Sequence, residues 1–158
     1  HTITRMNWEV KLITKVYKDN KIIFKKINFD LITMIDGFLI PQNHNKVITI
    51  PRTVLLQSLH RAAILTNEKF RGVRVVLAQG SLKIISSNAD QEEAQEELEV
   101  SYDAEALDIG FNVTYLLDVL NNVSNEAVEI RLADANSSAL ITLPGNDRFK
   151  YVVMPMRI

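Results

Sequence analysis

The chain has 158 residues, of which 47% are hydrophobic and 23% are charged, a composition typical of a soluble globular protein. It contains no cysteine, which excludes disulfides, thiolate metal sites and a cysteine nucleophile. No apolar run approaches the roughly 20 residues that a membrane-spanning helix needs, and the first residues do not form a signal peptide. A cytoplasmic protein is therefore expected.

The net charge of −1 is divided unevenly along the chain. Residues 1–50 carry eight Lys/Arg and four Asp/Glu, a balance of +4, whereas residues 51–158 carry ten and fifteen, a balance of −5. An acidic main part is a poor candidate for conventional reading of a DNA groove, which relies on neutralising phosphates. It still permits a protein that presents one basic face to DNA.

Residues 1–44 are predicted to form only part of a domain. Their alternation indicates three strands and two turns: strands at residues 10–17, 21–26 and 29–35, and turns at 19–20 and 36–37. Three strands bury little on both faces. The polar break at residues 41–45 therefore separates this part from a main domain at 45–158. Because the sequence begins with histidine rather than methionine, we expect a processed or excised piece.

The first half of the main domain is predicted to contain a strand, a helix and a hairpin: residues 46–50, 52–66, 72–78 and 82–86. The acidic run that follows, at residues 90–99, is ambiguous. Its composition favours a helix, whereas Leu98, Val100 and Tyr102 alternate with polar residues in the manner of a strand. We expect a strand whose acidic start is exposed.

The second half repeats this order with a strand, a helix and three strands: residues 107–111, 113–120, 128–132 and 138–143, and a closing strand that stops near Met154. Asn112 is a good N-cap for the helix, and Pro155 cannot donate to a sheet ladder. Two similar halves of this kind predict an α+β domain with two helices.

The end of the chain has two interpretations. The closing strand can simply complete a core, or the apolar tail beyond it, with Met156 and Ile158, can line a groove for a peptide. Methionine is flexible and polarizable, and it is common where a surface accepts several partners.

Catalytic motifs find little support in the sequence. His1, His44 and His60 have no metal-ligand spacing, and no phosphate-binding glycine loop or nucleophile elbow is present. No catalytic, cofactor-binding or metal-binding residue is assigned. The carboxylates from Glu92 to Glu97 leave one alternative, a small metal-dependent enzyme, although such a run is usually a solvated face. A binding role is therefore expected rather than an enzymatic one.

Five separated blocks resemble one family, the bacterial sliding clamp, which is the beta subunit of DNA polymerase III. The blocks occur in the family's order and spacing: residues 61–65, 67–74, 91–94, 110–115 and 151–158. Residues 45–158 resemble the third and last clamp domain, and residues 19–37 more weakly resemble the end of the second. The resemblance implies the DNA clamp fold, in which two helices on the inner face pack against antiparallel sheets on the outer face.

The resemblance also implies a function. In the family, two three-domain chains close head to tail into a homodimeric ring around double-stranded DNA, which they hold without sequence preference. The ring has no catalytic site. It confers processivity by tethering the DNA polymerase III alpha subunit, clamp-loader subunits and repair proteins, which dock a short Gln-Leu-x-Leu-Phe-like tail in a C-terminal groove. A ring needs basic residues only on its inner wall, which agrees with an acidic net charge.

The resemblance implies three sets of site residues. Arg61 is expected to face DNA, and so is Arg52, for which no family motif matches. The ring interface would comprise Ile64, Leu65, Asp90, Glu92, Glu93, Glu96 and Glu97. The peptide groove would be lined by Val152, Val153, Met154, Pro155, Met156, Arg157 and Ile158, with Asn112, Tyr115, Asn136 and Ser138 at its rim. Asn136 is polar where an apolar residue is expected.

The chain also departs from the family. The first domain and the start of the second have no counterpart here, so a ring of the family's kind is not expected from this chain alone. After Asp36-Gly37 the family continues with a Phe-Pro-Asp-Tyr-Arg-Arg-like stretch, whereas Phe38 here runs directly into Leu39. We therefore expect an incomplete, weak groove in an excised fragment or a divergent, truncated gene product, the extreme case being a non-functional clamp remnant.

Overall fold

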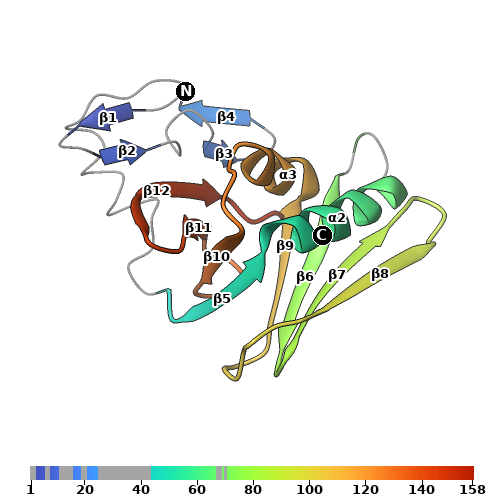
Figure 1. The fold of residues 1–158 in the computed structure, drawn as a ribbon. Helices are drawn as coiled ribbons and strands as arrows, with labels where there is room; N and C mark the ends of the chain where they lie inside the picture. The colour runs from blue at the N-terminus through green and yellow to red at the C-terminus, as the bar shows by residue number, and fades with distance from the viewer. Residues whose placement is uncertain are drawn as a thin grey trace.

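The computed structural model describes residues 3–5, 8–10, 16–18, 21–24, 44–66, 69 and 71–158 (Figure 1). The first four strands form two antiparallel pairs: β1 (Ile3–Arg5) with β2 (Trp8–Val10), and β3 (Val16–Lys18) with β4 (Lys21–Phe24). The antiparallel pairing of β3 with β4 agrees with the predicted hairpin, whereas the turn predicted at residues 19–20 lies outside the described residues. The strand predicted at 29–35 lies outside the described residues.

The main domain consists of two successive halves with the same order of elements. The first half comprises β5 (Lys46–Pro51), α2 (Arg52–Leu65), β6 (Gly72–Ala78), β7 (Ser81–Ser87) and β8 (Glu93–Glu99). The second comprises β9 (Leu107–Asn112), α3 (Val113–Asn121), β10 (Ala127–Leu132), β11 (Ala139–Leu143) and β12 (Asn146–Val153). The predicted repeat is confirmed, and the ambiguous acidic run is a strand.

The two halves exchange their first strands. One sheet has the order β8-β7-β6-β9 and the other the order β12-β11-β10-β5, all antiparallel, so β9 completes the first half's sheet and β5 the second's. The helices α2 and α3 contact each other beside the sheets (Figure 1). This exchange makes one domain of the two halves, because neither sheet is complete without a strand from the other half.

Matching contacts join the halves where each helix begins. The amide of Arg52 donates to the carbonyl of Glu126 at 2.7 Å, and the amide of Val113 donates to the carbonyl of Arg71, also at 2.7 Å. The two arginine side chains reach the opposite helix ends. The Arg52 guanidinium donates to Leu120 O at 3.1 Å, and that of Arg71 donates to Ala63 O at 3.3 Å. Each cation thus satisfies a carbonyl in the last turn of a helix, where the helix dipole favours positive charge.

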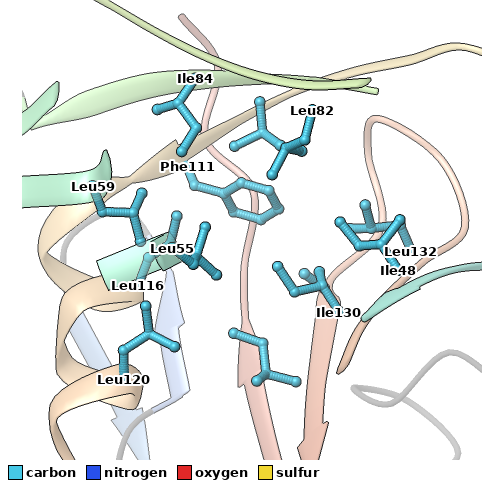
Figure 2. A pocket seen from close by; sticks show the side chains of 13 residues that line it. Ile48, Leu55, Leu59, Leu82, Ile84, Phe111, Leu116, Leu120, Ile130 and Leu132 are labelled. Carbon is cyan, nitrogen blue, oxygen red and sulfur yellow. The ribbon is translucent and has the colours of Figure 1, made fainter. Parts of the chain in front are cut away.

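The core lies between the two sheets and the two helices. Strand residues alternate between the core and the outside, as in β10, where Val128, Ile130 and Leu132 are buried. Figure 2 shows the ring of Phe111 at the centre of this core, among aliphatic side chains from both helices and both sheets. A cavity of about 20 Å³ beside it has an entirely apolar lining, so we expect it to be a dry packing void rather than a ligand site.

The described residues contain two helices, α2 and α3. Neither of them is long and apolar enough to cross a membrane. No group of three or more His, Asp or Glu side chains within the described part of the chain is arranged to hold a metal ion.

Candidate functional site

The segment after β12 has two anchors, one on each sheet. The strand ends at Val153, as predicted from Pro155, and pairs there with Ala139 of β11. Beyond the strand, the Met156 amide donates to the carbonyl of Gly110 in β9 at 2.9 Å. Residues 154–158 therefore run from the second sheet onto the first, and Figure 1 shows the C-terminus beside β6 and β9.

Two of the predicted groove residues meet at the first anchor. The Ser138 hydroxyl donates to the Met154 sulfur at 2.8 Å, and Ser138 is buried whereas Met154 is half-buried. The His44 ring lies on the other side of Ser138, with Nε2 at 3.1 Å from the Ser138 carbonyl oxygen. Met154 is thus positioned by Ser138, the residue before β11, and its remaining surface is available for contact.

The two valines of the predicted groove are fully buried, at 0% exposed. Val153 belongs to the main core, and Val152 pairs with Leu140 on the opposite face of the sheet. They support the segment that follows and present no surface of their own. The apolar residues open to contact are Met154, Pro155 and Met156, which are half-buried, and Ile158, which is exposed.

The predicted rim residues differ in their surroundings. The Asn112 side chain is buried and accepts a hydrogen bond from the Thr114 amide at 2.9 Å, so it caps α3. Tyr115 is half-buried one turn further on, and burial, together with the Asp118 charge, raises the pKa of its hydroxyl. Asn136 lies exposed in the turn before β11, where its amide donates to Asp134. Tyr115 and Asn136 are therefore reachable from solvent, and Asn112 supports the helix.

The surface expected at the ring interface lies along β8 and the end of α2. β8 is an edge strand, so one row of its backbone groups has no partner within its own sheet. Ile64 is 83% exposed near the end of α2, which contacts β8, whereas Leu65 is half-buried. A free strand edge beside an exposed isoleucine is a surface that can accept another strand.

The carboxylates of this region separate onto different faces. Glu96 pairs with Ile84 in the ladder and so lies on the core side towards α2, whereas Glu97 pairs with Lys83 on the outer side. Asp90 and Glu92 belong to the preceding turn, where both of their amides donate to the Asn88 side chain. Glu93 begins the strand on the outer side, opposite Ser87. The fold therefore separates these carboxylates instead of gathering them at one place.

Arg61 and Glu96 connect the expected DNA face with the expected ring interface. Their ion pair has an N–O distance of 2.7 Å, and the two side chains are 54% and 26% exposed. The hydrogen bond between them raises the pKa of Arg61 and lowers that of Glu96. An exposed pair of this kind contributes little to stability. Its main effect is electrostatic, because each side chain partly neutralises the charge of the other.

This pair gives a titration prediction. We expect the Glu96 carboxyl to titrate below its ordinary pKa of 4.5 in the folded chain, and to return towards that value in Arg61→Gln. Because folding favours the carboxylate, the pair's contribution is fully present above pH 4.5 and is lost as the pH falls through the lowered pKa. Carbon-detected NMR of the glutamate carboxyls measures this directly. Arg74→Gln is the control, and equal Glu96 pKa values in wild type and Arg61→Gln would contradict the assignment.

Arg52 differs from Arg61 in its surroundings. Its side chain is half-buried, its guanidinium is bonded to Leu120 at the end of α3, and its Nε is enclosed without a hydrogen-bond partner. Arg52 therefore joins the two helices in this structure. Arg61 is the one of the two that presents its charge at the surface.

Reasoning from the sequence missed three residues at these sites: His44 behind Ser138, Arg71 between the helices, and Gly110 under the tail. A glycine inside a strand pattern is itself a signal of close backbone approach, so Gly110 was open to prediction. His44 and Arg71 reach their partners across 94 and 8 residues respectively. No local pattern indicates such contacts.

Comparison with known proteins agrees with this geometry. The family described as DNA polymerase III beta subunit, C-terminal domain, matches residues 38–157. The beta sliding clamp of Pseudomonas putida is 50% identical over 120 residues, which are 76% of this chain and 33% of that protein. The chain thus spans about a third of the length of the curated relatives it matches.

Solved structures show the same fold. A crystal structure of the Pseudomonas aeruginosa sliding clamp with ligand has a TM-score of 0.75 and 44% identity, over 84% of this chain and 35% of that one. A clamp from the same organism bound to griselimycin has a TM-score of 0.75 and 43% identity, over 87% and 35%. Two helices and two antiparallel sheets are common to these proteins and this chain. The chain therefore belongs to the DNA polymerase III beta subunit family, the beta sliding clamps, and carries the C-terminal domain of that family.

Proposed function

We propose that this chain supplies the C-terminal domain of a sliding clamp, a non-catalytic accessory subunit that acts in the cytoplasm. In this role the complete clamp encircles double-stranded DNA and tethers DNA polymerase III, the clamp loader and repair proteins to it. Family membership and the names of the curated relatives support the role. We further propose that residues 1–44 are the end of the second clamp domain and residues 45–158 the third domain.

The docking part of the proposal is carried by one observation. Residues 154–156 follow a buried strand, and they lie half-buried between two anchors, Ser138 just before β11 and Gly110 in β9. An ordered apolar segment of this kind offers contact area without a large ordering cost when a partner binds. The proposed occupant is the short Gln-Leu-x-Leu-Phe-like tail of a replication or repair protein, with Tyr115 and Asn136 at the rim.

The ring part of the proposal uses the other two surfaces. The free edge of β8 and the exposed Ile64 would meet the first domain of a second clamp chain, and the carboxylates of residues 90–97 would face its basic edge. Charge complementarity of this kind sets orientation and specificity more than affinity. Arg61 would contribute a single DNA-facing charge, so this domain is expected to add little to the salt dependence of DNA binding.

A peptide titration tests the docking function. Fluorescence anisotropy of a labelled Gln-Leu-x-Leu-Phe peptide is expected to show saturable binding to the wild-type chain. Removal of residues 154–158 should abolish it, and Met154→Ala should weaken it by about tenfold, since a central apolar anchor typically contributes more than 1 kcal/mol.

Val54→Ala is the control, because this exposed apolar residue on α2 lies outside the proposed groove. Equal affinity of the wild type and the truncated chain would show that the groove assignment is wrong. A folded wild-type chain that binds no peptide would instead identify a clamp remnant that has lost partner docking.

A further inference from the structure

Gly72 and Gly110 leave an area without side chains on the outer face of the sheet β8-β7-β6-β9. We name these two residues the glycine shelf. In the ladder between β6 and β9, Gly72 pairs with Asn112 and Arg74 pairs with Gly110. The two glycines therefore lie on the same face as close diagonal neighbours. The residues next to them in each strand, Val73 and Phe111, point into the core.

Backbone conformation does not explain these glycines. Among the glycines in the described part of the chain, only Gly80 and Gly145 have a positive φ, and both lie in hairpin turns with open space around them. Gly72 and Gly110 have ordinary strand conformations, in which glycine is less favourable than other residues. Space is what distinguishes them.

The last residues of the sequence occupy that space. A methyl group built on Gly110 would overlap the carbonyl oxygen of Met156 and would lie 2.9 Å from both Cδ1 and Cγ1 of Ile158. A methyl group on Gly72 would lie 3.1 Å from Cδ1 of Ile158 and 3.5 Å from the Met156 sulfur. The Met156 amide is bonded to Gly110 itself. This close approach of the tail backbone to β9 is possible because position 110 has no side chain.

We propose that the glycine shelf is a seat for residues 156–158, and that Gly110 thereby acts as a positioning residue for the partner-binding segment. The proposal rests on the proposed docking function. The segment is held at one end by β12 and the Ser138–Met154 contact, and at the other by the Met156–Gly110 hydrogen bond. Pro155 joins the two anchors with a fixed φ.

This arrangement has a consequence for binding. If the second anchor is lost, Met156 becomes part of a loose end and Met154 keeps only its contact with Ser138, so a peptide must order residues 155–158 as it binds. Ordering of flexible side chains is a direct cost to affinity. The fold itself does not depend on the seat, because Ile158 remains 59% exposed while seated and lies outside the core cluster.

The test compares Gly110→Ala with the wild-type chain by two measurements. Amide hydrogen exchange at Met156 reports the seat, and peptide anisotropy reports docking. We expect Gly110→Ala to keep the urea midpoint of unfolding, to speed exchange at Met156 by about tenfold and to weaken peptide binding by about tenfold. Asp108→Ala, on the same strand and face, is the matched control and should leave both measurements unchanged.

A second variant makes the test independent of strand effects at position 110. Gly72→Ala should weaken binding less, because its methyl group meets only flexible side-chain atoms. Adding Ile158→Val removes Cδ1, the nearest of these atoms, and should restore the wild-type affinity.

Four outcomes separate the ideas. Unchanged Met156 exchange in Gly110→Ala would overturn the seat. Faster exchange with unchanged peptide affinity would overturn the positioning role. Gly110→Ala that unfolds the domain would show that the glycine serves the fold rather than the segment. A wild-type chain with a protected Met156 amide that binds no peptide would overturn the docking function, and the positioning role with it, while leaving the seat in place.

Discussion

Replacing Phe111 by alanine is expected to lower the free energy of unfolding by about 3–5 kcal/mol. The side chain is 2% exposed and lies where both helices and both sheets meet (Figure 2). The loss has two parts, the burial of the ring and the void that it leaves, which would enlarge the cavity already present beside it. Since a domain is stable by only about 5–15 kcal/mol in total, this single change removes a large share.

Urea unfolding monitored by circular dichroism measures this loss, provided that the slope of the transition is unchanged. Phe111→Leu keeps most of the volume and should cost clearly less. Val54→Ala, at an exposed position of α2, should stay within about 0.5 kcal/mol of wild type. If Phe111→Ala lowered the free energy of unfolding by less than about 1 kcal/mol, the ring would not be the central packing element of the core.

Replacing Arg52 by methionine is expected to cost about 1–3 kcal/mol, because the change leaves a carbonyl group at a helix end without its charged donor. Replacing Arg71 should cost less, because the Thr66 hydroxyl still donates to Ala63 O at 2.8 Å. Arg52 donates to Leu120 in the last turn of α3, and Arg71 donates to Ala63 in the last turn of α2 and to the Thr114 hydroxyl. Methionine keeps an apolar stem of similar length, so the loss reports the polar contacts. Thermal or urea unfolding of each variant gives the value.

Arg74 provides the matched control for these two variants. It lies only three residues after Arg71 and also forms an ion pair, with Asp108, but both side chains of that pair are about half exposed. Exposed pairs contribute about 0–1 kcal/mol, so Arg74→Met should be nearly neutral. If Arg74→Met lowered the free energy of unfolding as much as Arg52→Met does, the stabilising role assigned to the helix-end contact would be wrong.

The elements of the main domain were largely predictable because their signals are local. The acidic run forms a strand despite its helical composition, since a strand needs only one apolar face. Of the alternating residues that favoured this prediction, Leu98 lies in β8, whereas Val100 and Tyr102 follow its end at Glu99. Asn112 caps α3, as its side-chain chemistry indicated. Pro155 ended the last strand for an equally local reason.

The arrangement of the sites was less predictable because it depends on contacts distant in sequence. Register decides that Glu96 faces Arg61 while Glu97 faces away, and a shift of one residue would reverse both. The exchange of β5 and β9 decides that Arg52 reaches Leu120 rather than solvent. The positions of acidic residues in the sequence do not reveal how β8 pairs with β7. The sequence alone therefore grouped carboxylates that the fold places on different faces.

Methyl NMR of the chain labelled at methionine and alanine tests the central claim most directly, namely that residues 154–156 bind partner peptides. Addition of a Gln-Leu-x-Leu-Phe peptide is expected to shift the methyl signals of Met154 and Met156 in a saturable way. The methyl signal of Ala94 in β8, on the surface assigned to the ring interface, should stay in place. Binding that moves Ala94 and leaves both methionines unchanged would contradict the account, and would place partner docking on the strand edge instead.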